Sequence, residues 1–136
     1  MNSEGLVTIA SKHSVAGTIN RLASIVSSKG LMVFARIDHG KGARDAGLEL
    51  RPTELLIFGH AKGGTPLMQD RQIAGLDLPL RALAWEDERG AVWLSYQLAS
   101  WVASRHGLGP RRAAAVEAID RGLSVMCAVA VAIDLA

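Results

Sequence analysis

The chain has 136 residues, of which 49% are hydrophobic and 21% are charged, and its formal net charge is +2. This length suits one domain with a buried core, and the composition is that of a globular protein rather than a disordered one. The fifteen basic residues form no dense stripe and do not alternate with aromatic residues, which argues against nucleic-acid binding. We therefore expect a single domain over residues 1–136 and no nucleic-acid partner.

Cysteine content and hydropathy indicate the compartment. With Cys127 as its one cysteine, the chain cannot form an intramolecular disulfide. Residues 1–10 lack the basic region and apolar run of a signal peptide. The most apolar stretch, residues 123–133, is eleven residues long, whereas a membrane-spanning helix needs about 20. We expect a cytoplasmic protein with no membrane partner.

The first elements in chain order are a short strand and a helix. Residues 6–10 have the apolar pattern of a strand, and Ser14 then stands where a helix N-cap is expected. Apolar residues follow at helical spacing: Val15, Ile19, Leu22 and Val26. Gly30 suits the end of this helix, because glycine tolerates the left-handed conformation found there.

Two further strands are apolar on both faces. They are predicted over residues 31–38 and 53–58, and the segment 39–46 between them has weak helical character. A glycine-rich loop over residues 60–65 follows the second of these strands. Thr65-Pro66 then resembles an N-cap and a first helical position, which predicts a short helix to about residue 71.

The last third of the chain contains a hairpin and two helices. Residues 80–86 and 91–97 are predicted strands, and the four residues between them end in glycine, as in a β-hairpin loop. Residues 98–106 indicate a short helix that stops at Gly107. Residues 111–135 carry apolar residues at three- and four-residue steps, which predicts a long helix with a broad apolar face.

This order predicts an α+β protein with two layers. A strand, a helix, four strands and a long helix (β-α-β4-α) fit a mostly antiparallel sheet with helices packed on one face. Because the strands at 31–38 and 53–58 are apolar on both sides, the second face also needs cover. One helical layer cannot cover both faces, so we expect a homodimer formed through the sheet or its edge.

Five blocks, in order along the chain, resemble the bacterial domain-of-unknown-function family 302. They are residues 14–22, 29–46, 52–59, 65–68 and 76–96. The resemblance implies a β-α-β4-α arrangement similar to the TATA-binding-protein-like fold, and it supplies no established activity. After Gly59 the family usually has Asn-Pro where this chain has His60-Ala61, so a role tied to that turn is not carried over.

Asp38 and His39 form one candidate catalytic pair. They follow a predicted strand, where a carboxylate could orient an imidazole for proton transfer. The structural alternative is that Asp38 caps the next helix and His39 lies in its first turn.

His60, Lys62 and Tyr96 are candidate ligand-binding residues. A glycine-rich turn with a lysine before a helix can hold an anion, although the order of a phosphate-binding P-loop is absent. Tyr96, together with Trp85 and Trp93 in the hairpin, could form a ligand platform between the sheet and the long helix. The alternative for these aromatic residues is a place in the core or in a dimer interface, with the two tryptophans paired across the hairpin.

We expect no metal site and no cofactor. If the strands at 31–38 and 53–58 are antiparallel neighbours, His39 and His60 lie at opposite ends, roughly 20 Å apart. The chain shows none of the close ligand pairs of zinc motifs. Cys127 is interpreted as a small core residue, because nothing cationic lies one helical turn away.

The leading functional hypothesis is a homodimeric binding or interaction module, with a small ligand near Asp38 and His39 or between the sheet and a helix. One alternative is a small enzyme that uses His39 with Asp38 as acid and base, and Lys62 to hold an anionic substrate. Another is an accessory subunit of a larger complex.

Overall fold

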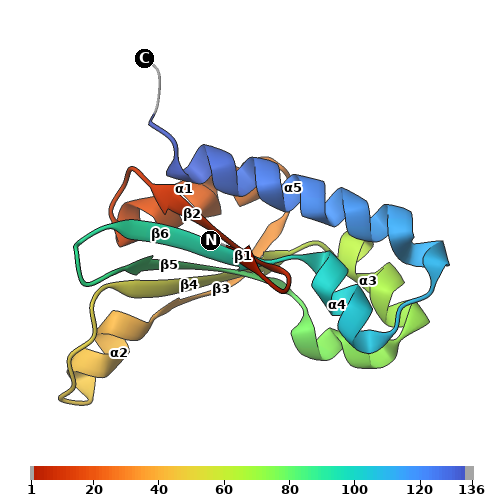
Figure 1. Ribbon diagram of the computed structural model, residues 1–136, viewed down its shortest axis with the longest axis horizontal. Coiled ribbons are helices and arrows are strands. Elements are labelled where there is room, and N and C mark those ends of the chain that lie inside the picture. The colour runs from red at the N-terminus through yellow and green to blue at the C-terminus, as the bar shows by residue number, and fades with distance from the viewer. Residues whose placement is uncertain (1, 134–136) are drawn as a thin grey trace.

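The computed structural model describes residues 2–133 and contains a six-stranded sheet in the order β1-β2-β6-β5-β4-β3 (Figure 1). Its strands are β1 (Asn2–Ser3), β2 (Leu6–Ser11), β3 (Met32–Asp38), β4 (Thr53–Gly59), β5 (Leu80–Glu86) and β6 (Val92–Gln97). Every neighbouring pair of strands is antiparallel. The predicted antiparallel sheet is confirmed, and the two-residue strand β1 is an addition to it.

Two helices, α1 (Val15–Ser28) and α5 (Ala113–Val131), cover one face of this sheet (Figure 1). The core between the layers contains Val15, Ile19, Leu22, Val26, Leu56, Phe58, Leu94, Leu123 and Met126. The remaining helical segments are α2 (His39–Asp45), α3 (Ala61–Asp70), η1 (Gln72–Asp77), α4 (Ala99–His106) and η2 (Pro110–Arg112). The α+β class with helices packed on one face is therefore confirmed.

The predicted helix start and hairpin turn have the expected local chemistry. Ser14 Oγ accepts a hydrogen bond of 2.9 Å from the backbone N–H of Gly17, which satisfies one of the free donors of α1. Gly30 has φ +78° just after the helix, a conformation that side chains other than glycine's adopt rarely. In the hairpin, Asp87 Oδ1 accepts from the backbone N–H groups of Arg89 and Ala91.

The prediction around residues 60–71 was wrong in one respect. The segment 60–65 is not a loop, because α3 begins at Ala61 and contains Pro66. His60 caps this helix, which packs against η1 and α5, so that a side chain added at Gly63 or Gly64 would lie within 4 Å of Ile119 or Leu78. Packing thus overrides the low helix propensity of glycine.

The long helix is shorter than predicted. It runs over Ala113–Val131, because η2 occupies the preceding turn and Ala132 is extended. The predicted last residues, 134 and 135, lie outside the described part of the chain.

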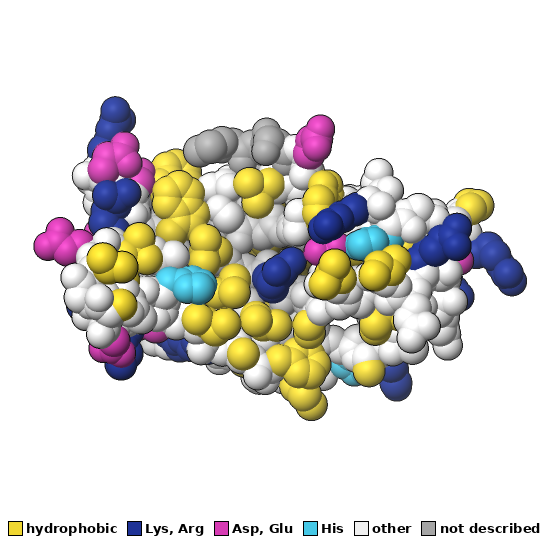
Figure 2. Space-filling model, turned by 90° about the horizontal axis from the view of Figure 1, so that it is seen from below, with side chains coloured by type: hydrophobic (Ala, Val, Ile, Leu, Met, Phe, Trp, Pro, Cys, Tyr) yellow, Lys and Arg dark blue, Asp and Glu magenta, His cyan; other side chains and the backbone are white. Residues whose placement is uncertain are grey.

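The second face of the sheet is also apolar. Along β4, Leu56 and Phe58 are buried under the helices, while Leu55 and Ile57 point the other way and are half-buried. Hydrophobic side chains gather along this open face (Figure 2). No helix within residues 2–133 is long and apolar enough to cross a membrane.

Candidate functional site

A groove of about 800 Å³ lies where α3, α5, the end of α1 and one end of the sheet meet. Its size is within the usual range for small-molecule sites, about 300–1,000 Å³. The larger apolar side chains of the wall are Leu31, Phe34, Met68, Leu78, Leu80, Ile119, Val125 and Met126. Glycines at 63, 64 and 122 let the backbones of α3 and α5 border the space directly.

The charges in the lining all have one sign. Lys29 at the end of α1, Lys62 in α3 and Arg121 in α5 contribute to the wall, and no aspartate or glutamate of the described chain lines it. Among residues 2–133, neither lysine side chain forms an ion pair, and Arg121 Nη1 lies 3.6 Å from Glu117 Oε1 in a pair about 70% exposed to solvent. The groove is therefore apolar with a cationic border.

His60 also lines the groove and fixes the start of α3. Its Nδ1 accepts a 3.0 Å hydrogen bond from the backbone N–H of Lys62. A neutral imidazole with an accepting Nδ1 carries its proton on Nε2. His60 thus positions the helix turn that carries Lys62 and keeps one ring N–H available to donate.

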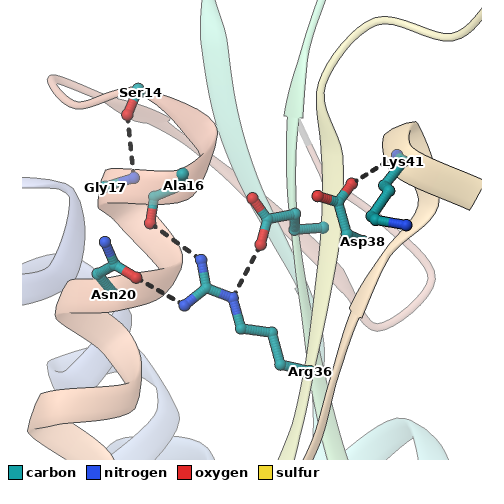
Figure 3. Close-up of polar contacts among 8 residues, drawn as sticks. Ser14, Ala16, Gly17, Asn20, Arg36, Asp38 and Lys41 are labelled. Carbon is teal, nitrogen blue, oxygen red and sulfur yellow. Dashed lines mark hydrogen bonds and ion pairs between the residues drawn. The ribbon is translucent and has the colours of Figure 1, made fainter. Parts of the chain in front are cut away.

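Asp38 and His39 lie where β3 passes into α2. Figure 3 shows the Asp38 carboxylate directed at the backbone nitrogen of Lys41, and Oδ1 accepts that N–H at 2.8 Å. Asp38 is thus the N-cap of α2, which is the structural alternative for this residue. His39 is the first residue of α2 and is exposed, and within residues 2–133 its ring makes no hydrogen bond.

The sheet register separates the two sets of candidate residues. Asp38 pairs with Glu54 at one end of β3 and β4, and Met32 pairs with Gly59 at the other. His60 and Lys62 therefore lie together at the groove, and His39 lies at the far end, as expected for antiparallel neighbours. In the described part of the chain, no three His, Cys, Asp or Glu side chains are grouped to hold a metal ion.

A polar contact between α1 and the sheet lies close to Asp38 (Figure 3). Arg36 Nε donates to Glu54 Oε1 at 2.8 Å, and Arg36 Nη1 donates to Asn20 Oδ1 at 2.6 Å. Because the Glu54 side chain is only 10% exposed, it requires this partner. The contact is structural, since both Arg36 and Glu54 are already paired.

Tyr96 faces the helices and lies outside the lining of the groove. Burial raises the pKa of the Tyr96 hydroxyl, and a hydrogen bond with Ser124 lowers it. Burial also raises the pKa of Cys127 to about 12, which keeps the thiol protonated. The Trp85 and Trp93 rings pair on the opposite, open face of the sheet, with centroids 6.3 Å apart.

A buried cluster around Asp77 has no counterpart in the sequence-based candidates. His106 Nε2 donates to Asp77 Oδ2 at 2.6 Å, and Arg105 Nη1 donates to both carboxylate oxygens at 3.0 and 3.1 Å. The side chains of Asp77 and His106 are 8% and 7% exposed. These bonds tie η1 to α4, and η1 supplies Gly75 to the groove wall.

Three curated relatives come from Brucella suis, Brucella abortus and Brucella melitensis. Each is 55% identical to this chain over 118 residues and is named a fluoride-specific ion channel, FluC 1 or FluC 2. The match covers 87% of this chain but only 44–46% of each relative. The chain thus spans less than half the length of these relatives.

A crystal structure of an uncharacterised conserved DUF302 protein from Bacillus stearothermophilus has the same fold. It superposes with a TM-score of 0.75, covers 95% of this chain and 97% of its own, and is 15% identical. The family model for the domain of unknown function DUF302 matches residues 7–126. This chain therefore belongs to the DUF302 family.

Proposed function

We propose that this chain is a binding module whose groove between α3 and α5 holds an amphipathic anion, a molecule with an alkyl chain and a carboxylate head. The observation that carries the proposal is the composition of the wall, in which apolar side chains are bordered by Lys29, Lys62 and Arg121 and, within residues 2–133, by no carboxylate. An alkyl chain matches the apolar wall, and a single negative charge matches the border.

The alkyl chain and the carboxylate of the ligand contribute differently to the binding free energy. Burying the eight methylene groups of decanoate is worth about 6 kcal/mol, at about 0.8 kcal/mol for each CH₂. An exposed ion pair with a lysine adds about 1 kcal/mol or less. The loss of translational freedom on binding offsets several kcal/mol of this sum. We therefore expect the apolar wall to supply most of the affinity and the cations to select a carboxylate over an alcohol.

The test is isothermal titration calorimetry with decanoate on a variant that fills the groove. Gly122→Leu is suitable because an added Cβ at Gly122 meets no atom within 4 Å, and replacing a helical glycine favours the helix. Gly42→Leu in α2 is the matched control, since its Cβ also meets open space and it lies outside the groove lining. The proposal requires decanoate to bind the wild type and Gly42→Leu, and to bind Gly122→Leu at least tenfold more weakly.

The cations are tested separately with Lys62→Gln and its control Lys41→Gln in α2. Lys62→Gln should weaken decanoate binding severalfold and leave decanol binding unchanged, because the head group alone contacts the cation. Equal affinity of decanoate and decanol for the wild type would contradict the role of the cationic border.

We also propose that the module is a homodimer in which a second copy covers the open face of the sheet. Leu55, Ile57 and Leu83 on this face are half-buried in the single chain and would be buried in the dimer. Stable interfaces bury about 1,200–2,000 Å² in total, and a sheet face can supply this area. Sedimentation equilibrium should give twice the chain mass for the wild type and the chain mass for Leu83→Lys, with Glu88→Lys in the hairpin loop as control. A monomeric wild type would contradict the proposal.

A third part of the proposal concerns the larger protein with which the module works. The curated relatives contain the matched segment within a longer chain named for a fluoride-specific channel, so we infer that the module is accessory to a membrane channel. The test is fluoride efflux from vesicles that contain the Brucella suis relative with and without its matched segment. Equal efflux rates for both proteins would contradict an accessory role of the module in the channel.

A further inference from the structure

We propose that the face around the mouth of the groove docks onto the surface of an anionic phospholipid bilayer. This inference rests on the proposed ligand, because alkyl chains with an anionic head partition into bilayers rather than remain in water. A groove that takes such a molecule would receive it most directly where the protein touches the membrane surface.

Exposed apolar side chains surround the mouth. Phe34 of β3 and Val125 of α5 both line the groove, and they are 53% and 55% exposed. Val129, one helical turn after Val125, is 49% exposed, and Met32 beside Gly59 is 59% exposed. Side chains of this size, left in water at the rim of an apolar space, are suited to insertion at the boundary between head groups and alkyl chains.

The charge of the same rim fits an anionic surface. Lys29 just after α1, Lys62 in α3 and Arg121 in α5 converge on the groove, and none of the described residues that line it is acidic. A surface that combines exposed apolar residues with cations is typical of proteins that lie on membranes. Docking requires no membrane-spanning segment, so it is compatible with the helix lengths of this chain. It does go beyond the expectation of no membrane partner, which rested on the eleven-residue length of the apolar stretch at residues 123–133.

The expected changes in vesicle binding follow from the charge of the rim and from the insertion of its apolar side chains. Removing one cation near an anionic surface lowers the partition coefficient about fivefold, and reversing its charge lowers it about 25-fold. Salt should weaken the binding, because screening shortens the range of the attraction to about 8 Å at physiological ionic strength. Removing an inserted phenyl ring should lower the partition coefficient on neutral and anionic surfaces alike.

The experiment is cosedimentation of the full chain with vesicles of phosphatidylcholine alone and of phosphatidylcholine with 30% phosphatidylglycerol. The wild type should bind the anionic vesicles at least tenfold more strongly. Lys62→Glu and Phe34→Ser should weaken this binding, and the controls Lys41→Glu and Leu48→Ser, at the α2 end of the molecule, should not. Leu48 is 66% exposed, which makes it comparable with Phe34.

Gly122→Leu separates docking from ligand binding, since it fills the groove without removing any rim side chain. It should keep vesicle binding while losing decanoate binding. Decanoate binding without any preference for anionic vesicles would overturn the docking proposal alone. Vesicle binding weakened equally by the control variants would also overturn it. Vesicle binding without decanoate binding would instead overturn the proposed ligand.

Discussion

Replacing Asp77 by alanine should destabilise the protein more than replacing any exposed acid. The Asp77 carboxylate is nearly buried and accepts hydrogen bonds from His106 Nε2 and Arg105 Nη1. Asp77→Ala removes the acceptor and leaves both donors in place. The two donors differ in exposure, and this difference sets the magnitude of the effect.

The His106 side chain is 7% exposed, so its N–H cannot easily find water, and an unsatisfied buried donor costs about 1–3 kcal/mol. The Arg105 side chain is 47% exposed and can be rehydrated, so loss of its pair costs about 1 kcal/mol or less. The free energy of unfolding should therefore fall by about 1–4 kcal/mol. For a chain of this length the melting temperature should fall by roughly 3–12 °C.

Urea unfolding followed by tryptophan fluorescence measures this change. The slope m should stay constant while the midpoint falls, because the unfolded surface is unchanged. Asp45→Ala is the control, since Asp45 is 65% exposed and its partner Lys41 is equally exposed, and its loss should cost less than about 0.5 kcal/mol. If Asp77→Ala changes stability as little as Asp45→Ala, the buried cluster does not hold η1 against α4.

Other predictions concern single residues. Asp38→Ala should lower the free energy of unfolding by about 0.5–2 kcal/mol in urea titrations, because α2 loses its N-cap. His39→Ala should leave decanoate affinity unchanged in calorimetry. A loss of decanoate affinity in this variant would indicate that the ligand binds near α2 instead. The Cys127 thiol, with a pKa of about 12, should resist a thiol reagent at pH 8 until the protein is unfolded. The Trp93 hydrogen bond lowers the pKa of Asp87 below its ordinary 3.8, so its stabilisation is present above pH 3.8 and lost as pH falls through the lowered pKa. Trp93→Phe should lose part of this acid dependence in urea titrations from pH 6 to pH 2.

Features fixed by neighbouring residues were predictable from the sequence. Ser14 caps α1 and Asp38 caps α2, because each side chain reaches a backbone N–H three residues later. Gly30 and Gly90 mark the end of a helix and a hairpin turn, because both positions need positive φ. The strands β3 and β4 themselves were predictable from their apolar patterns.

Features that depend on distant residues were not predictable. Asp77 and His106 are separated by 29 residues, and only the docking of η1 on α4 brings them together. The groove likewise combines Lys29, Lys62 and Arg121 from three helices, of which only Lys62 stood out in the sequence. The glycines before Pro66 indicated a loop, whereas the structure has them inside α3, next to η1 and α5.

The most direct test of the groove as a ligand site is a titration of isotope-labelled protein with decanoate, followed by amide chemical shifts in NMR spectra. We predict saturable shifts concentrated at residues 59–65 and 115–126, with Gly63 and Gly122 among the largest, and their loss in Gly122→Leu. Shifts concentrated at His39 and α2, or no saturable shifts at millimolar decanoate, would contradict the proposed function.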